Sequence, residues 1–283
     1  MFNRVGKPIC PGTNPSRLRP TPFVAAALVA EQLIAATLAP AQAADLSIKA
    51  AAPSAPAYSW SGCYLGVNAG AGGGGSNFNT VVGDGTLLAP ADAALVATAG
   101  GNGSGSTTSW LGGGQAGCNW QNATFVYGFE GDFDYFRNRP QIVNGTNTLS
   151  DGTPFGVTQS LQTDYFASAR GRLGIAADRN LFYVTGGVAF TQISYMQTYV
   201  DANTPPGIGS ASTTKSLIGW TVGAGWEFAM TNNWIVRAEY LFAKFPSTNA
   251  QGMIADSTGA SNPLRGSADL AVQIARLGLS YKF

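Results

Sequence analysis

From residue 58 onward, apolar side chains alternate with small or polar ones, so that the pattern repeats every two residues. A two-residue period indicates β-strands, because successive side chains of a strand point to opposite faces of the sheet. The segments that follow this rhythm cover, approximately, residues 58–72, 108–121, 124–136, 162–176, 180–198, 214–229, 233–245 and 269–283. The pattern therefore predicts an all-β chain of eight antiparallel strands.

The connections between these segments alternate strictly between short and long. Tight turns are predicted at 122–123, 177–179 and 230–232. The long connections are rich in Gly, Ser, Thr and Asn, and they cover residues 73–107, 137–161, 199–213 and 246–268. Transmembrane barrels of the bacterial outer membrane have short periplasmic turns and long extracellular loops. We therefore expect such a barrel, with both ends of the chain on the periplasmic side.

The alternation also sorts side chains by chemistry. In the third segment, Phe125, Phe129 and Phe133 share one face, and Glu130 and Asp132 share the other. The polar faces contain almost no Lys and are rich in Gly, Arg, Asp and Glu, which suits a narrow lumen where small residues relieve crowding and opposite charges pair. Because lipid offers no hydrogen-bond partner to a free strand edge, the sheet must close. The predicted fold is an eight-stranded antiparallel transmembrane β-barrel with its apolar face toward lipid.

The last segment departs from this regularity. Leu270, Val272 and Ile274 are out of phase with the apolar set that ends at Leu277 and Leu279. An extra residue in one strand shifts the phase of the side chains that follow it. We therefore expect a β-bulge or a frayed strand near residue 270.

The predicted lumen carries a set of eight charged residues. They are Glu130, Asp132, Arg170, Arg172, Glu227, Arg237, Glu239 and Arg276. Buried charges need partners, because an unpaired one is strongly destabilising. We expect salt bridges and hydrogen bonds that hold the interior together. The alternative is a narrow ion path or gate. Paired carboxylates also serve glycoside hydrolysis, but a filled lumen would exclude a sugar chain.

The first 57 residues have a different composition. Residues 1–20 are basic and polar, residues 23–38 are apolar apart from a polar pair that includes Glu31, and Ala41-Gln42-Ala43 is a small-x-small cleavage site. This order predicts a secretory signal peptide over residues 1–43; the alternative is an N-terminal helix of the mature chain. The Ala/Pro-rich residues 44–57 are expected to form a flexible periplasmic lead-in to a barrel domain at 58–283. The expected location is the bacterial outer membrane.

Cysteines and aromatic residues near the segment ends add two expectations. Cys63 and Cys118 fall near the periplasmic ends of neighbouring segments. The periplasm is oxidising, so a disulfide would form if the Cα atoms lie within about 7 Å; the alternative is a pair of thiols that pack as small apolar groups. Aromatic residues at these positions are expected to form interfacial girdles. The set consists of Trp60, Trp110, Trp120, Trp226, Trp234, Tyr281 and Phe283.

The composition argues against several kinds of chemistry. The chain contains no His, which removes Ser-His-Asp catalysis and most transition-metal sites. Residues 112–117 match a dinucleotide-binding glycine pattern, but that motif must open a helix, and here a strand surrounds it. With a formal net charge of +1 and no basic cluster, nucleic acid is not an expected partner. We expect no catalytic residue, cofactor or metal.

Three short motifs carry a resemblance to a known family. They are Trp60-Ser-Gly-Cys-Tyr-Leu-Gly, Leu111-Gly-Gly-Gly-Gln-Ala-Gly-Cys-Asn-Trp-Gln and Tyr281-Lys282-Phe283. With the Ala/Pro-rich lead-in, they resemble the small porin-like immunogenic outer-membrane proteins of alphaproteobacteria, within the wider group of eight-stranded OmpA-like barrels. The resemblance covers the whole predicted mature chain. It implies a non-enzymatic structural protein and surface antigen, and a terminal aromatic residue, Phe283, that the outer-membrane assembly machinery reads.

Other partners and functions are expected from the predicted location. Outer-membrane lipid and lipopolysaccharide should surround the barrel, and host or phage molecules could be met by the long loops. Two alternative functions stay open. One is a low-conductance porin-like channel for small solutes or ions, and the other is a secreted soluble β-sandwich adhesin.

Overall fold

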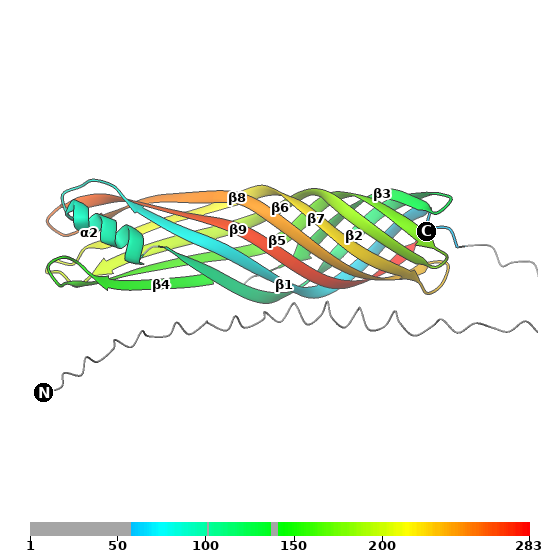
Figure 1. The fold of residues 1–283 in the computed structure, drawn as a ribbon, viewed down its shortest axis with the longest axis horizontal. Coiled ribbons are helices and arrows are strands. Elements are labelled where there is room, and N and C mark those ends of the chain that lie inside the picture. Colours follow the sequence, from blue (N-terminus) through cyan, green and yellow to red (C-terminus); the bar gives the residue numbers. More distant parts are fainter. Residues whose placement is uncertain (1–57, 101, 137–140) are drawn as a thin grey trace, which may run out of the picture. The chain divides into compact units, whose positions relative to one another are not determined.

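The computed structural model describes residues 58–100, 102–136 and 141–283. The predicted signal peptide (1–43) and lead-in (44–57) lie outside the described residues. The described chain is almost entirely β-structure (Figure 1). Its elements are β1 Gly62–Val82, α2 Pro90–Leu95, the π-helical turn η1 Val96–Gly100, β2 Gly103–Asn122, β3 Phe125–Tyr135, β4 Gln141–Thr148, β5 Pro154–Ala177, β6 Asn180–Asp201, β7 Ile208–Ala229, β8 Trp234–Ala255 and β9 Ser261–Lys282.

The strands form one closed antiparallel ring. Their order is β3-β2-β1-β9-β8-β7-β6-β5-β4, and pairing of β3 with β5 closes the sheet. Both β3 and β4 pair with β5: Tyr135 lies opposite Tyr165, and Gln141 lies opposite Leu161. The two strands thus follow one another along a single edge of β5. This explains why the described residues contain nine strands where the sequence predicts eight segments.

The three short turns lie where the sequence predicts them, next to the C terminus (Figure 1). The long connections differ from the prediction, because most of their residues continue the strands. Gly75 pairs with Ser106, for example, although both fall in the predicted first loop. Their Gly and Ser residues have no strong strand preference of their own, so pairing with neighbouring strands decides their conformation. At the far end of the barrel, α2 lies between β1 and β2 (Figure 1).

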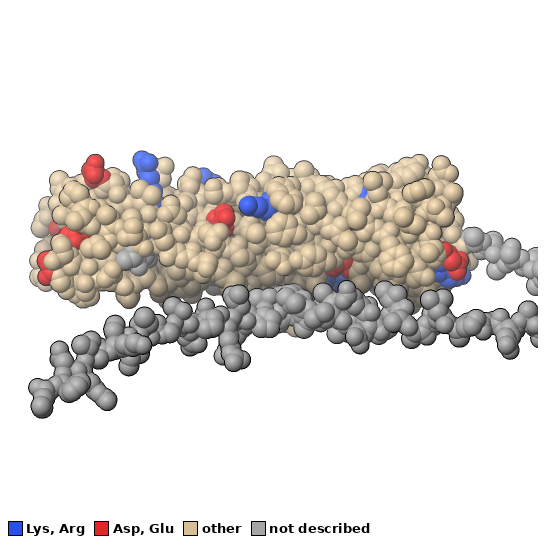
Figure 2. Space-filling view, in the orientation of Figure 1, with Lys and Arg blue, Asp and Glu red and all other residues tan. Residues whose placement is uncertain are grey.

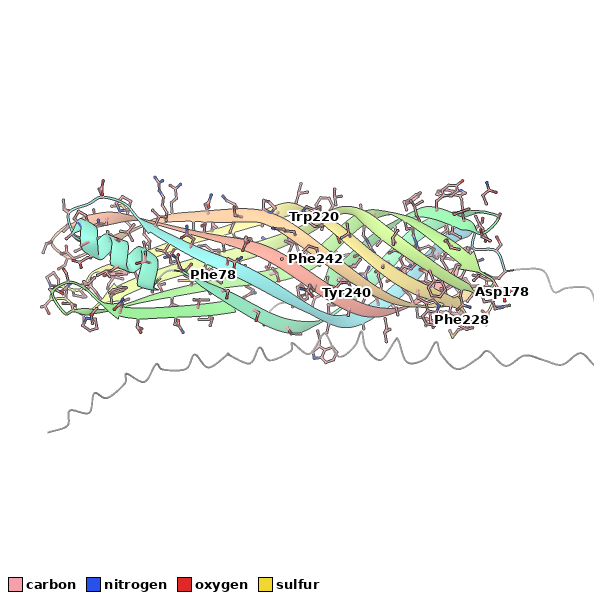
Figure 3. The ribbon with its side chains drawn as sticks, viewed as in Figure 1. Phe78, Asp178, Trp220, Phe228, Tyr240 and Phe242 are labelled. Atoms are coloured by element: carbon pink, nitrogen blue, oxygen red, sulfur yellow. A yellow bond between two sulfur atoms is a disulfide. The ribbon has the colours of Figure 1, made fainter. Side chains whose placement is uncertain are left out.

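Large apolar side chains cover the outside of the half of the barrel near the short turns. On β7, every second residue from Ile218 to Phe228 points outward, and the large ones among them are exposed or half-buried. This apolar stretch is 11 residues long, which matches the 9–11 residues that a tilted strand needs to span a bilayer. Trp220 lies near one end of the stretch, midway along the barrel, and Phe228 marks the other end (Figure 3). We call this zone the apolar band.

The other half of each long strand has the opposite pattern. On β9, Leu270, Val272 and Ile274 are buried in the interior, on the same face as the inward Arg276 and Ser280. The expected bulge is present on one side of β9: its register with β8 shifts between Phe245 and Thr248, opposite Leu270 and Ala268, with the extra residue in β8. β9 itself keeps one register with β1 and one set of inward positions through this stretch. The change of phase has another cause. Beyond the apolar band the outside meets water, so apolar side chains take the inward positions of β9, although the alternation of inward and outward positions along β9 does not change.

The outer surface changes accordingly. Beyond the band, outward positions on β6 and β7 carry hydroxyl and amide groups, including Gln192, Ser194, Ser212 and Ser216. Charged side chains are sparse on the visible wall (Figure 2). Among the described residues, no helix is long and apolar enough to cross a membrane. The closed ring with large apolar side chains outside contradicts the soluble β-sandwich alternative, which would bury them between two sheets.

One predicted girdle residue lies elsewhere. Trp60 is fully buried, where it packs with Tyr58, Leu181 and Ile235 inside the mouth next to the short turns. Its indole Nε1 donates a hydrogen bond of 3.2 Å to the carbonyl oxygen of Asp178, in the turn between β5 and β6. Trp60 precedes β1 but keeps the alternation of that strand, which places it on the inward face with Tyr64. The remaining aromatic residues of the predicted girdle are exposed on the outside, as expected.

Candidate functional site

The eight predicted lumen charges all point into the barrel and are buried. They come from β3, β5, β7, β8 and β9, which places them around most of the wall. Three pairs face each other in register: Glu130 with Arg170, Glu227 with Arg237, and Glu239 with Arg276. The structure therefore brings the whole set together at the level of the apolar band, where a bilayer would surround it.

Arg170 and Arg276 connect opposite parts of the wall. The Arg170 guanidinium lies 2.6 Å from Glu130, 2.9 Å from Asp132 and 3.0 Å from Glu239. The Arg276 guanidinium lies 3.1 Å from Asp132 and 2.7 Å from Glu239, between oxygen and nitrogen atoms. Each arginine thus bridges carboxylates on different strands, and these contacts cross the lumen.

The other two arginines complete the network. Arg172 and Arg237 both contact Glu227 at 2.7 Å, and both also contact Glu130. A single carboxylate, Glu130, is therefore shared by three arginines. The Arg172 guanidinium also lies 4.0 Å from the centre of the Tyr183 ring, a cation–π distance. Such mutual pairing is what a group of buried charges requires.

Several members of the network are absent from the predicted set. Asp134 lies 2.5 Å from Arg276, and the Ser168 hydroxyl donates to Asp132 at 2.5 Å. The hydroxyls of Tyr64 and Tyr183 donate to Glu130 and Glu239 at 2.5 and 2.9 Å. The two-residue period places Asp134 on the same face as Asp132, so it could have been included. The tyrosines are harder to find, because their rings count as apolar in the pattern.

Packed layers close the lumen on both sides of the charges. Toward the short turns lies the cluster around Trp60. On the other side, the large apolar cluster includes Phe136, Phe166 and Phe245. Within that part of the barrel, Gln159 and Gln197 are fully buried and donate to the Thr80 hydroxyl at 3.1 and 2.7 Å. The interior thus alternates apolar packing with paired polar groups along the barrel axis.

The first connection folds over the far mouth of the barrel. Leu88 and Val96 are buried in the large apolar cluster. The backbone N–H of Leu88 donates 2.8 Å to the side-chain oxygen of Asn262 on β9. In α2, Asp92 accepts hydrogen bonds from the backbone and hydroxyl of Ser150 at 2.7 and 3.0 Å. These contacts anchor α2 to the barrel although the sequence shows few apolar anchors there.

The two remaining predicted sites lie next to each other near the short turns. Cys63 and Cys118 are opposite residues of β1 and β2 and are joined by a disulfide. Phe283 donates its backbone N–H to the carbonyl oxygen of Cys63 at 3.0 Å, and its side chain is exposed. Its ring centre lies 5.5 Å from that of Tyr281. The glycine pattern at 112–117 lies within β2, so no helix follows it.

In this interior, carboxylate and guanidinium groups neutralise one another. The carboxylates that a hydrolase would need are held by guanidinium groups, and their side chains are closed off from solvent. In the part of the chain that the structure describes, no group of His, Cys, Asp and Glu side chains is arranged to hold a metal ion.

Known proteins are similar to this chain in sequence. Residues 33–283 match the family described as outer membrane protein beta-barrel domain. The 31 kDa outer-membrane immunogenic protein of Brucella melitensis is 32% identical over 256 residues, which cover 86% of this chain and 93% of that protein. The 25 kDa outer-membrane immunogenic protein of Brucella canis is 28% identical over 229 residues, or 81% of this chain and 82% of that protein.

Among solved structures, the outer membrane protein OprG from Pseudomonas aeruginosa matches 80% of this chain and 98% of its own, with a TM-score of 0.39 and 10% identity. The family match and the Brucella relatives confirm the expected resemblance and the location in the bacterial outer membrane. This chain belongs to the outer-membrane protein β-barrel domain family.

Proposed function

We propose that this outer-membrane barrel is a structural, non-enzymatic protein that does not conduct ions, and that its extracellular part serves as a surface antigen. The observation that carries the proposal is the charge network across the lumen, in which Arg170 contacts carboxylates from two other strands at 2.6–3.0 Å. An ion that entered would have to displace a paired guanidinium or carboxylate. Breaking a buried pair costs about 3–5 kcal/mol.

The packing on either side of the network supports the same proposal. A channel needs a continuous polar path, and here the cluster around Trp60 and the cluster around Phe245 interrupt it. The anchored α2 covers the far mouth. The proposed structural role then belongs to the barrel wall, which forms a rigid cylinder in the membrane and carries an extension above it.

The antigenic role is proposed from the relatives and from the exposed tips. Both Brucella relatives are named immunogenic outer-membrane proteins. At the tip between β8 and β9, hydrogen bonds from Thr258 hold the pKa of the Asp256 carboxyl below its usual range and order the turn. An ordered polar tip presents a fixed surface to antibodies, and host or phage molecules are proposed to meet the same tips. Antibodies against the folded protein should bind intact cells; failure to bind would contradict the antigenic role.

Planar-bilayer recording tests the closed lumen. The purified barrel should give no reproducible unit conductance, whereas a variant with two lumen arginines removed, Arg170→Ala with Arg276→Ala, should leak. The second candidate function, a low-conductance channel, is favoured by the position of charges at membrane level. It would replace our proposal if the unaltered protein conducts and the ion selectivity changes in Arg276→Ala. Heat-modifiable migration on a gel verifies that each sample is folded.

A further inference from the structure

Two adjoining hollows lie on the outside of the barrel, in the apolar band. One has a volume of about 520 Å³ and the other about 580 Å³. They share the outward side chains of Tyr127, Leu173 and Val184, which lie in one row across β3, β5 and β6. The rest of their lining is mostly aromatic and aliphatic. Together they form a depression on the surface that faces lipid.

Paired glycines create the first hollow. Gly171 on β5 lies opposite Gly186 on β6, and both occupy outward positions where neighbouring residues carry large side chains. Neither glycine is needed for close backbone packing. A Cβ atom added at Gly171 would meet nothing closer than 3.9 Å, and one at Gly186 nothing closer than 3.6 Å. The space above them is therefore open toward the membrane.

The depth of the hollows corresponds to one leaflet. Gly171 is six residues from Ala177, where β5 ends at the short turn, and six residues of a strand tilted by about 40° rise roughly 15 Å along the membrane normal. The hydrocarbon core is about 30 Å thick, so this is half of it. The second hollow covers the remaining distance to the turn, between Ile175 and Phe182. An extended acyl chain of the inner leaflet has this reach.

A cation lies at the membrane surface below the hollows. Arg179 belongs to the turn that joins β5 and β6, the strands that line both hollows. Its guanidinium donates to the Ala229 carbonyl oxygen at 3.1 Å and to Asn232 at 3.4 Å, and it lies 5.6 Å from the centre of the Tyr58 ring at the mouth of the barrel. It has no ion pair within the described residues. A guanidinium with spare donors binds phosphate well.

We infer that the two hollows hold an acyl chain of an inner-leaflet phospholipid, whose phosphate group binds Arg179. The Gly171–Gly186 pair leaves space for the acyl chain, the row of side chains through Leu173 packs against the acyl chain, and the arginine binds the headgroup. The site would retain a specific lipid where most of the wall meets exchanging lipid.

Native mass spectrometry of the full barrel, extracted from membranes in a mild detergent, tests this site. The unaltered protein should carry phospholipid in stoichiometric amount. Gly171→Val and Gly186→Val should lose most of it, because each valine occupies the floor of the first hollow, where an added Cβ meets nothing closer than 3.6 Å. Gly112→Val is the matched control, since Gly112 is an outward glycine on β2 where an added Cβ meets nothing closer than 3.6 Å and which lines neither hollow. It should keep the lipid.

The variant Arg179→Gln tests the contact with the lipid headgroup separately from the contact with the acyl chain. We expect this variant to retain several times less phospholipid than the unaltered protein, with unchanged heat-modifiable migration. Equal lipid content in the unaltered protein, Gly171→Val and Gly112→Val would overturn the inference. So would a cross-linked dimer that disappears in Gly171→Val, because a second copy would then occupy the surface. None of these results depends on whether the lumen conducts.

Discussion

Arg170 is the residue whose loss should affect the barrel most, because it neutralises three carboxylates at once. In Arg170→Ala, Glu130, Asp132 and Glu239 would lose a shared partner in a site without water access. We expect the free energy of unfolding to fall by about 3–5 kcal/mol, the usual cost of breaking a buried pair. Urea unfolding in lipid vesicles, followed by tryptophan fluorescence, measures it.

Lys244→Ala provides the comparison, because Lys244 is exposed on the outside and has no ion pair among the described residues. Its effect should stay within about 0.5 kcal/mol. If the two alanine variants unfold alike, the network contributes no stability and its proposed role is wrong. Replacing a lumen pair with methionines, as in Arg170→Met with Glu239→Met, should recover part of the loss, because no unpaired charge then remains at either position.

At the scale of single residues, the sequence predicts which face a side chain takes better than it predicts which residues that side chain contacts. A two-residue period fixes which face a charged side chain takes, so all eight lumen charges could be predicted from their positions alone. It does not tell that Glu130 is shared by three arginines, because this depends on how the closed ring brings distant strands together. Nor does it show that the hydroxyl groups of Tyr64 and Tyr183 donate to carboxylates of the network.

Among the elements, β9 shows what periodicity cannot distinguish. Its apolar residues change face near Ile274, and a bulge and a change of surroundings give the same pattern in a sequence. β9 keeps one register with β1 and one set of inward positions, and the extra residue opposite Leu270 lies in β8, so the surroundings explain the change of face. The sequence also predicts strands that are too short, because it does not show what surrounds them. Ser and Gly on a strand outside the membrane look like a loop when only their own preferences are considered.

The position of the membrane boundary on β7 can be tested by arginine substitution. Val222 and Ser212 both point outward, but Val222 lies in the middle of the apolar band and Ser212 lies beyond it. Val222→Arg should lower the free energy of unfolding by about 2–4 kcal/mol, and Ser212→Arg by about 0–1, because the cost of a lipid-facing charge falls steeply toward the interface. Equal costs in vesicle unfolding experiments would place both residues in lipid and refute the boundary.

At the scale of the whole molecule, apolar and polar side chains exchange faces along the strands. One half of the barrel is therefore surrounded by lipid and the other half by water. Near the short turns it is a membrane protein, with charges inside and apolar side chains outside. Beyond the apolar band it is built like a water-soluble protein, with Phe166 and Phe245 in a core and hydroxyl groups outside. The strands β5–β9 are 22–24 residues long, about twice what a bilayer requires. The excess should stand above the cell surface.

Thiol labelling of intact cells measures how far the cylinder extends. Ser106 and Ala116 are both exposed, outward residues of β2, and the existing disulfide leaves no free thiol in the described chain. A maleimide reagent that cannot cross membranes should label Ser106→Cys rapidly, because this position lies beyond the band. It should not label Ala116→Cys, which lies within the band, until the protein is unfolded. Labelling of neither in cells would mean that the upper wall is covered by other envelope components, and labelling of both would mean that the apolar band does not lie in the membrane.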